Sequence, residues 1–331
     1  MISRELSDFT HVPVLYEQTL EALRVCPTGI YVDCTTGGAG HSAGVLSKLS
    51  TGGLLICLDK DDEALRAADV RLSAIRSDGA FRLIKSDFGE LARVLADLRI
   101  SAVDGIMADL GVSSHQLDTG ERGFSYNHDG PLDMRMDQSR ELTAAELINT
   151  WPEEEIARVL KDFGEERHSA RLARAIVTRR ARQPFETTGE LSDLLCAAMP
   201  GKSKKEKQHP AKRSFQALRI AVNGELDSLT SLLDCAPDCL APGGRLAIIS
   251  FHSLEDRLVK TAYRDWEHPC VCPPGLPCVC GQKPLGRIVG PRKGMVADER
   301  EMERNTRARS ARLRIFERGS EWSAGDDRSK G

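Results

Sequence analysis

The stretch Tyr31-Val32-Asp33-Cys34-Thr35-Thr36-Gly37-Gly38-Ala39-Gly40-His41-Ser42 decides the fold of this chain. The apolar residues from Ile30 to Val32 predict a strand, and the glycines after them predict a tight turn. From Ser42 onward, apolar residues recur at helical spacing, so a helix follows the turn. A strand, a glycine-rich turn and a helix N-terminus are typical of a nucleotide-type site, because glycines let a ligand approach the backbone and the helix end offers N–H groups.

This turn fits three kinds of structure. Residues Gly38 to Ala43 match the dinucleotide-binding pattern G-x-G-x-x-G/A. The stretch that starts at Asp33 equally suits the D-x-T-x-G-x-G turn of methyltransferases that use S-adenosylmethionine (SAM). An ordinary turn between a strand and a helix, with no ligand, is the third alternative. In a ligand site, Asp33 could accept hydrogen bonds from a hydroxyl or an ammonium group.

A second acid follows at the spacing that a nucleoside site requires. Residues 54–59 predict a buried strand that ends in Asp59. An acid about 20 residues past a glycine-rich turn, at the end of the next strand, is where a ribose diol is bound. Asp33 and Asp59 together therefore favour a nucleoside ligand over an ordinary turn.

Strands and helices alternate along the first part of the chain. Strands are predicted at 30–34, 54–59, 81–84 and 103–110, and later at 245–250 and 311–317. Helices are predicted from 41, at 63–75 and at 91–98. This rhythm indicates a parallel, doubly wound sheet that binds ligands at the carboxyl ends of its strands. Four acids fall at or just after such ends and point to one cleft: Asp33, Asp59, Asp87 and Asp109.

A helical region interrupts the predicted sheet. Residues 111–244 separate two of its strands, which is far longer than a usual connection in such a fold. Helical patterns occur in this region at 144–149, 152–163, 168–180 and 191–199. The sequence therefore predicts a discontinuous first domain at 1–117 and 209–331, with an inserted helical substrate-recognition domain at 118–208. A long helix from Ser214 to about Leu233 is expected to lead back into the first domain.

The composition is compatible with a protein of the cytoplasm. The chain has 331 residues, of which 40% are hydrophobic, and no run approaches the ~18 apolar residues of a membrane span. Its N-terminus lacks the pattern of a signal peptide, so we expect a cytoplasmic location and no membrane contact. The net charge of −3 hides basic runs at 202–219 and 287–318, which suit contact with phosphate groups.

Polar residues follow the predicted fourth strand, from Asp109 to Asp118. Their position beside the glycine-rich turn lets them reach a ligand or a second substrate. The alternative is that Ser113 and Ser114 simply cap a helix. The sequence has no G-x-S-x-G elbow, which disfavours a serine hydrolase.

Aromatic and basic side chains supply candidate RNA contacts. Arg122, Phe124 and Arg135 lie in two neighbouring motifs, and rings interleaved with arginines suit stacking on unpaired bases. Lys212 and Arg213 form a basic cluster at the start of a predicted helix. The alternative for the apolar members of the two motifs is to pack a domain junction: Phe124, Leu132, Met134 and Met136.

His252 follows the fifth predicted strand and is a further candidate RNA contact. It could instead be catalytic, or it could be a hydrogen-bonded scaffold residue. The sequence leaves these roles open, with the scaffold role favoured.

Four cysteines are close together in a segment rich in proline and glycine: Cys270, Cys272, Cys278 and Cys280. Four thiolates at this spacing could bind a structural zinc ion, although C-x-C pairs are less typical of zinc sites than C-x-x-C pairs. Thiols without a metal, or thiols that oxidise readily, are the alternative. The other cysteines are scattered and are expected to be small core residues.

Three sequence blocks are especially specific: Asp109-Leu110-Gly111-Val112-Ser113-Ser114, Gly130-Pro131-Leu132-Asp133-Met134-Arg135-Met136 and Ser250-Phe251-His252-Ser253-Leu254-Glu255-Asp256-Arg257. With them, the chain resembles the RsmH/MraW family of SAM-dependent 16S rRNA (cytosine-N4)-methyltransferases from His11 to about Phe316. The resemblance implies an α/β class I SAM-methyltransferase fold, with a Rossmann-like seven-stranded doubly wound sheet and an inserted all-helical domain. It implies methylation of a decoding-region (P-site) cytosine in 16S rRNA, in the small ribosomal subunit or its precursor. The oligomeric state stays open, and a homodimer is one option.

The resemblance also implies which residues contact SAM. The family's contacts fall here on Ala39, Gly40, His41, Asp59, Phe88, Asp109 and Gln116. The turn itself adds Asp33 and Gly37 as candidates. Ala39 stands where the family usually has glycine, and its methyl group costs little if its φ angle is negative.

Methylation at N4 of cytosine needs an amine aimed at the methyl group, in line with the leaving sulfur. The lone pair of this amine is delocalised into the ring, so an acceptor for its N–H bonds would localise it, and positioning would supply most of the rate. Asp109 is the candidate for this role, with cofactor binding as its alternative role. Two other functions remain open: an NAD(P)-dependent oxidoreductase, and a non-catalytic RNA-binding protein of ribosome assembly.

Overall fold

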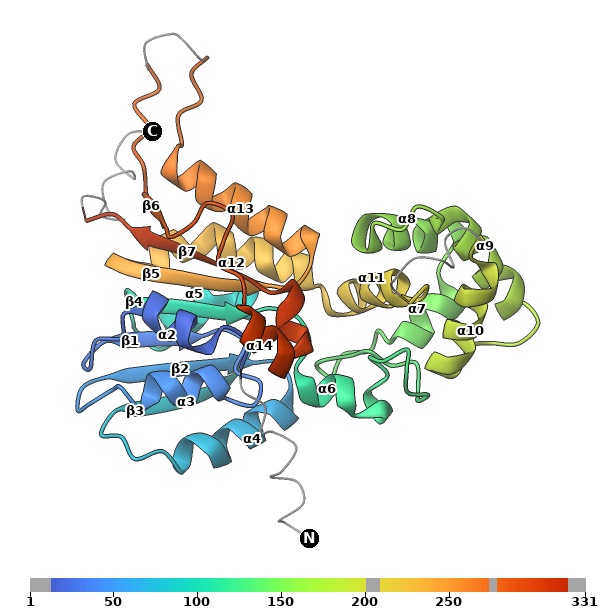
Figure 1. The fold of residues 1–331 in the computed structure, drawn as a ribbon, viewed down its shortest axis with the longest axis horizontal. Helices are drawn as coiled ribbons and strands as arrows, with labels where there is room; N and C mark the ends of the chain where they lie inside the picture. Colours follow the sequence, from blue (N-terminus) through green and yellow to red (C-terminus); the bar gives the residue numbers. More distant parts are fainter. Residues whose placement is uncertain (1–12, 201–208, 274–278, 321–331) are drawn as a thin grey trace. The chain divides into compact units, whose positions relative to one another are not determined.

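The computed structural model describes residues 13–200, 209–273 and 279–320. The chain forms two compact units, Met1–Gly111 with Leu226–Gly331, and Val112–Glu225 (Figure 1). The second unit therefore extends beyond both ends of the helical insert predicted at 118–208.

The first unit is built on a seven-stranded sheet with the order β3-β2-β1-β4-β5-β7-β6. Its strands are β1 (Ile30–Asp33), β2 (Leu54–Asp59), β3 (Ala80–Lys85), β4 (Val103–Asp109), β5 (Leu240–Ser250), β6 (Gly286–Val289) and β7 (Arg312–Arg318). The strands β1 to β5 pair in parallel, whereas β7 runs antiparallel to β5 and β6. The order reverses between β1 and β4, so a topological switch point lies there, where ligands bind in such sheets. This topology confirms the predicted doubly wound α/β fold.

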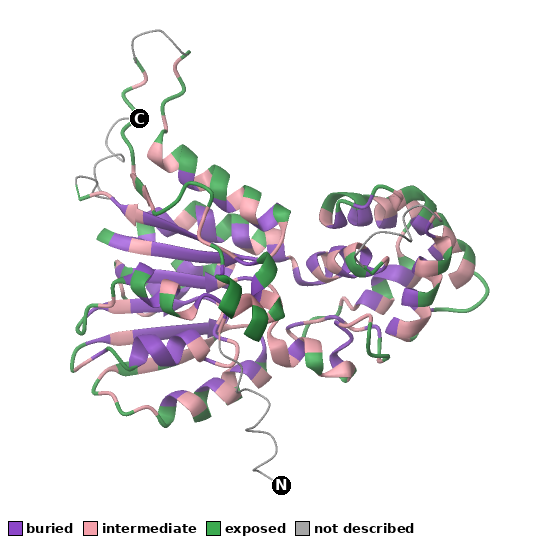
Figure 2. Ribbon diagram, in the orientation of Figure 1, coloured by how far each residue is buried: buried purple, intermediate pink, exposed green. Residues whose placement is uncertain are grey.

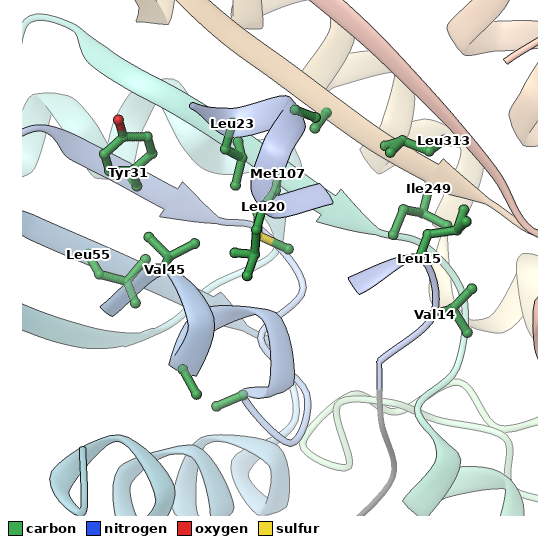
Figure 3. Close-up of a cluster of buried hydrophobic side chains, with 14 of the residues drawn as sticks. Val14, Leu15, Leu20, Leu23, Tyr31, Val45, Leu55, Met107, Ile249 and Leu313 are labelled. Carbon is green, nitrogen blue, oxygen red and sulfur yellow. The ribbon is translucent and has the colours of Figure 1, made fainter. Parts of the chain in front are cut away.

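Helices cover both faces of this sheet. They are α2 (Tyr16–Leu23), α3 (Gly40–Leu46), α4 (Asp62–Ser73), α5 (Leu91–Asp97), α12 (Glu225–Cys239), α13 (Ser253–Glu267) and α14 (Glu299–Arg304), with the short 3-10 helices η1 (Phe88–Glu90) and η4 (Thr306–Ser310). Successive side chains of β2 point to opposite faces, so Leu55 packs with α2 and α3 (Figure 3), while Ile56 packs with α5 and α12. The central strands are consequently lined with buried residues (Figure 2).

The second unit is helical and has a core of its own. Its helices are α6 (Ser114–Asp118), α7 (Ala144–Thr150), α8 (Glu153–Gly164), α9 (Ser169–Arg180), α10 (Thr188–Ala198) and α11 (Lys212–Asn223), with the 3-10 helix η2 (Gly120–Arg122). Four residues of the sequence motifs are buried in this core: Phe124, Leu132, Met134 and Met136. The sequence offered packing at a domain junction as their alternative role, and the structure shows packing in the core of the second unit. No helix within the described ranges of either unit is long and apolar enough to cross a membrane.

The helix predicted from Ser214 to about Leu233 is two helices in the structure. Gly224 adopts φ +63° and its N–H caps the carbonyl of Ile220, which ends α11. Asn223, at the end of α11, is buried, donates to the carbonyl of Met134 and accepts from the N–H of Met136, both at 2.7 Å. These bonds tie the end of α11 to the 130s segment, which explains why the second unit continues past the predicted boundary at Gln208.

We expect Gly105→Ala to destabilise the first unit. A Cβ atom at this position of β4 would lie 2.7 Å from Cδ1 of Tyr31. This ring is 2% exposed, and its hydroxyl accepts a hydrogen bond from the N–H of Cys26, so it has little room to move. Overpacking of this kind costs about 1–3 kcal/mol, which urea denaturation would measure as a lower midpoint.

Gly319→Ala is the matched control in the same unit. The nearest atom to its added Cβ, the carbonyl oxygen of Leu285, would lie at an ordinary contact distance of 3.5 Å. Its free energy of unfolding should stay within about 0.5 kcal/mol of that of the parent protein. Equal losses in the two variants would contradict the steric argument.

Candidate active site

Hydrogen bonds to neighbouring strands hold the glycine-rich turn between β1 and α3. The N–H and the hydroxyl of Thr36 both donate to a carbonyl of β2 at 3.0 Å. The N–H of Gly37 donates to Oδ2 of Asp59 at 2.8 Å, and the hydroxyl of Thr35 accepts from the N–H of Asp109 at 2.5 Å. The turn is therefore fixed at the switch point, against the carboxyl ends of β2 and β4.

Asp33 is buried beneath this turn. Its Oδ1 accepts from the N–H of Thr35 at 3.1 Å, and its Oδ2 accepts from the hydroxyl of Ser42 at 2.6 Å. Burial raises the pKa of Asp33 to about 6, although both hydrogen bonds act against the rise. The structure thus shows Asp33 bracing the turn and the start of α3, while its contact with a ligand stays a prediction. Ser42, which the sequence did not single out, is part of this brace.

Ala39 adopts φ +55°, so the condition of a negative φ angle stated for this residue is not met. A left-handed conformation costs a residue with a Cβ atom roughly 1–2 kcal/mol. The side chain is 0% exposed and joins the core of α2 and α3, and burial of one methyl-sized group returns about 0.8 kcal/mol. Burial therefore offsets much of the cost of alanine at this position.

Gly40 allows the N-terminal segment to cross the turn. A Cβ atom on Gly40 would lie 2.2 Å from Cγ of Pro13, so only glycine fits without displacing that proline. The next residue, His41, is 4% exposed, and its Nε2 lies 3.1 Å from the carbonyl of Val14. Burial lowers the pKa of His41 to about 4, so its ring is neutral at pH 7. Its Nδ1 lies 3.8 Å from Oδ2 of Asp109, at the end of β4.

Asp59 and Phe88 lie at the ends of β2 and β3. Both oxygens of Asp59 accept backbone hydrogen bonds, Oδ2 from Gly37 and Oδ1 from Asp61 at 2.9 Å. Burial nevertheless raises the pKa of Asp59 to about 6. Phe88 starts η1, is 8% exposed, and has Nζ of Lys60 at 6.0 Å from its ring centroid. The predicted contacts of both residues with a cofactor remain predictions.

Asp109 differs from these acids because one of its oxygens lacks a hydrogen-bond partner. Among the described residues, its Oδ1 is buried and accepts no hydrogen bond. Loss of solvent raises the pKa of Asp109 well above its ordinary value, and the neighbouring carboxylates of Asp33 and Glu255 raise it further. A buried polar atom without a partner costs about 1–3 kcal/mol. A ligand that offers an N–H group or a positive charge would remove this cost.

Glu255 is a member of this acidic group that the sequence analysis did not single out. It is 2% exposed, and its Oε2 accepts the N–H of Phe251 at 2.8 Å. His252 caps α13 through the N–H of Glu255, and Nε2 of His252 lies 3.1 Å from Oε1 of Glu255. The structure thus gives His252 the scaffold role, and its RNA contact stays a prediction. The spacing His252-x-x-Glu255 is that of a capping box, a signal that could have identified Glu255.

Gln116 and Ser113 cap α6 in the second unit. The N–H of Gln116 donates to the hydroxyl of Ser113 at 3.2 Å, and Oε1 of Gln116 accepts the N–H of Ser113 at 3.0 Å. The capping alternative for Ser113 is therefore confirmed. Gln116 is 5% exposed, and its role as a SAM contact stays a prediction.

Arg122, Phe124 and Arg135 have internal roles in the second unit. Arg122 is 3% exposed and donates to the carbonyls of Arg135 and Met136 at 3.1 and 3.0 Å. Phe124 is 6% exposed, so its ring is not presented for stacking on a base. Arg135 forms a two-bond ion pair with Asp133, at 2.9 and 2.7 Å. These contacts hold the 122–136 segment together, and RNA contact by these residues stays a prediction.

The basic cluster lies at the start of α11. Lys212 is exposed and Arg213 is half-buried. Just before the helix, His209 stacks on Tyr126 with ring centroids 4.6 Å apart. Lys212 is thus the candidate most open to a phosphate. The other lysines of the basic run, from Lys202 to Lys207, lie outside the described residues.

The sequence matches the MraW methylase family over residues 8–319. A relative from Symbiobacterium thermophilum, named ribosomal RNA small subunit methyltransferase H, is 53% identical over 307 residues, which cover 92% of this chain and 96% of the relative. Relatives of the same name from Brevibacillus brevis and Heliobacterium modesticaldum are 50% and 51% identical, and the matches cover 94% of this chain and 98% and 99% of theirs. The similarity therefore spans both units.

The buried carboxyl group of Asp33 should give the ligand-free protein a distinctive pH dependence. Its pKa of about 6 in the folded state lies above its ordinary value of 3.8, so the folded state holds this proton more tightly. Stability from this group is therefore lost as pH rises, by about 1 kcal/mol between pH 5 and 8. Urea denaturation over this range should show a flatter pH profile for Asp33→Asn, and parallel profiles would contradict the argument.

Proposed function

Because the chain belongs to the MraW methylase family, we propose that it transfers a methyl group from SAM to the N4 amine of a decoding-region (P-site) cytosine in 16S rRNA. The names of its relatives support small-subunit ribosomal RNA as the substrate. The small ribosomal subunit or its precursor would present this RNA, in the cytoplasm. Membership of a methylase family replaces the alternative of an NAD(P)-dependent oxidoreductase.

The observation that carries the proposal is the buried Oδ1 of Asp109, which accepts no hydrogen bond among the described residues. It lies at the end of β4, at the switch point where ligands bind in doubly wound sheets. The hydrogen bond from its N–H to Thr35 ties its backbone to the glycine-rich turn. A nucleoside ligand on this turn would therefore come close to a carboxylate oxygen that has room for one more donor.

The three acids Asp33, Asp59 and Asp109, called the acidic rim below, suit a cationic cofactor. When bound, SAM supplies a methyl group on a positively charged sulfonium. Gly37, Ala39 and Gly40 would offer it a closely approachable backbone, and Asp59 would lie at the end of β2 for its ribose. Asp33, Asp59 and Asp109 all have raised pKa values, chiefly because of burial. A nearby positive charge lowers the pKa of a carboxyl group, so cofactor binding would favour their ionised forms.

Ionised Asp109 would then accept a hydrogen bond from an N–H group of the target amine. Such a bond localises the lone pair of the amine, which makes it a better nucleophile. His41 is neutral at pH 7 and Glu255 is a buried acid, so neither side chain is an electrophile. The methyl group of SAM would be the electrophile of the site. Most of the rate would come from holding the amine in line with the bond that breaks.

The first test uses small ribosomal subunits purified from cells that lack this protein. They are incubated with the protein and methyl-labelled SAM, and the RNA is digested to nucleosides for mass spectrometry. We expect label in N4-methylated cytidine at one position. Label in another nucleoside would overturn the substrate, and SAM binding without any label would favour the non-catalytic assembly factor.

Asp109→Asn in the same assay separates the two roles of this residue. If Asp109 polarises the amine, labelling should fall about 10²–10⁴-fold, while the dissociation constant for SAM, measured by calorimetry, changes only a few-fold. A loss that appears entirely in SAM affinity would assign Asp109 to cofactor binding instead. Asp69→Asn, an exposed acid of α4, is the matched control and should leave both quantities unchanged.

Lys212→Gln combined with Arg213→Gln tests the proposed RNA contact at the start of α11. Removal of two phosphate contacts should weaken RNA binding about tenfold and reduce its salt dependence by about two counterions. SAM affinity should stay the same, because neither residue is among the predicted SAM contacts. The control replaces Lys161 and Arg171, both exposed in the same unit, by Gln. Equal losses of RNA and SAM affinity would contradict the assignment.

A further inference from the structure

The segment between α13 and β6 brings three cysteine sulfurs together, away from the acidic rim. The Sγ atoms of Cys270, Cys272 and Cys280 all lie within 4.8 Å of one another. Those of Cys270 and Cys280 are 3.7 Å apart. Cys278, the fourth cysteine of the sequence motif, lies outside the described residues and is not counted among the ligands below.

These distances suit three ligands of a single ion. A zinc–sulfur bond is about 2.3 Å long, so two thiolates on one tetrahedral zinc ion lie about 3.8 Å apart. The separation of 3.7 Å between Cys270 and Cys280 agrees with this value. A disulfide requires about 2.05 Å between the sulfurs, so the pair is not oxidised in this structure.

Core packing does not explain the cluster. Cys270 is exposed, and Cys272 and Cys280 are only half-buried. The two valines beside them are turned to solvent, with Val271 76% and Val279 87% exposed. In an apolar core, the valine side chains would be at least as buried as the thiols. Here the sulfurs converge while the hydrophobic side chains do not.

A backbone hydrogen bond reaches one of the three sulfurs. The N–H of Val279 lies 3.3 Å from Sγ of Cys272 and donates to it. Three thiolates this close would repel one another, and a soft divalent cation removes that repulsion. Thiolates select zinc among the common ions, and the tetrahedral arrangement is the one zinc prefers in structural sites.

We propose that Cys270, Cys272 and Cys280 bind a zinc ion that stabilises the connection between α13 and β6. The described parts of this connection, residues 268–273 and 279–285, project beyond α13 and β6 (Figure 1). β6 starts at the amino-terminal edge of the parallel strands, because it runs antiparallel to β7, which runs antiparallel to β5. The ion therefore lies at the edge opposite to Asp33 and Asp109, and its role is structural.

The two ends of the connection are already joined. The N–H of Leu285 donates to the carbonyl of Trp266, and the N–H of Ile288 donates to Glu267, both at 2.9 Å. Closing a loop between two joined ends costs entropy, and a metal that links Cys270 and Cys272 to Cys280 offsets part of that cost. The zinc ion would thus hold Cys280, a few residues before the short edge strand β6, close to the two cysteines that follow α13.

Metal analysis of the full-length protein tests the proposal. The protein is purified anaerobically with a reductant and without chelators, and its zinc content is measured by plasma mass spectrometry. We expect about one zinc ion per chain, and a thiolate-to-metal charge-transfer band after replacement of zinc by cobalt(II). Absence of zinc together with absence of this band in the reconstituted protein would overturn the proposal, as would stoichiometric copper or iron in place of zinc.

Cysteine variants locate the ion. Cys272→Ser should lower the zinc content at least tenfold, whereas Cys26→Ser, an exposed cysteine elsewhere in the first unit, should retain it. In the parent protein, chelation should speed alkylation of the three cysteines at least tenfold, a readout that does not depend on folding of a variant. Unchanged zinc in Cys272→Ser would overturn the assignment. SAM affinity and methyl transfer are measured on the same samples, so failure of this proposal is distinguishable from failure of the proposed function.

Discussion

The site depends on one constraint, which is that β2 and β4 extend further than the strand between them. Asp33, the last residue of β1, pairs with Cys57 in β2 and with Met107 in β4. Asp59 and Asp109 come later on those two strands, so the chain leaving β1 turns in a notch between two acids. The hydrogen bonds from Gly37 to Asp59 and from Asp109 to Thr35 are consequences of this register. The glycines permit the turn, but the strand lengths position it.

The same register concentrates negative charge where little solvent reaches. The rim contains Asp33, Asp59 and Asp109, and Glu255 is a neighbour of Asp109. The pKa values of the three rim acids are raised because ionising a buried carboxyl group costs free energy. A cationic ligand offsets that cost, so affinity for the ligand and stability of the fold are linked. Under the proposed function, a cationic cofactor would complete the charge balance of these acids.

The sequence predicted the sheet well because its signals are local. Residues 54–58 are a continuous apolar run that ends at Asp59, and β2 has the predicted bounds of 54–59 in the structure. The failures involve distant partners. Gly224 caps the end of α11, but a lone glycine in a helical pattern does not by itself predict a break, and the bonds between Asn223 and the 130s segment are not visible in the local sequence. The short strand β6 exists because β7, further along the chain, pairs with it. The φ angle of Ala39 is +55°, which no local pattern in the sequence indicated.

Motif residues divide into those that hold the site and those that are open to a ligand, and sequence alone does not separate them. Arg122 and Phe124 are candidate RNA contacts in the sequence, and in the structure they also hold the core of the second unit together. For Ser113 and His252 the sequence left several roles open, among them a helix cap and a scaffold residue, and both cap helices in the structure. In each case, the polar or aromatic group has an internal role. Asp109 shares with His252 a buried polar atom that has no hydrogen-bond partner among the described residues, but its Oδ1 lies at the end of β4, beside the glycine-rich turn. Because such an atom costs about 1–3 kcal/mol, a ligand that donates a hydrogen bond at this end of the sheet would be favoured there, whereas the helix cap already gives His252 an internal role.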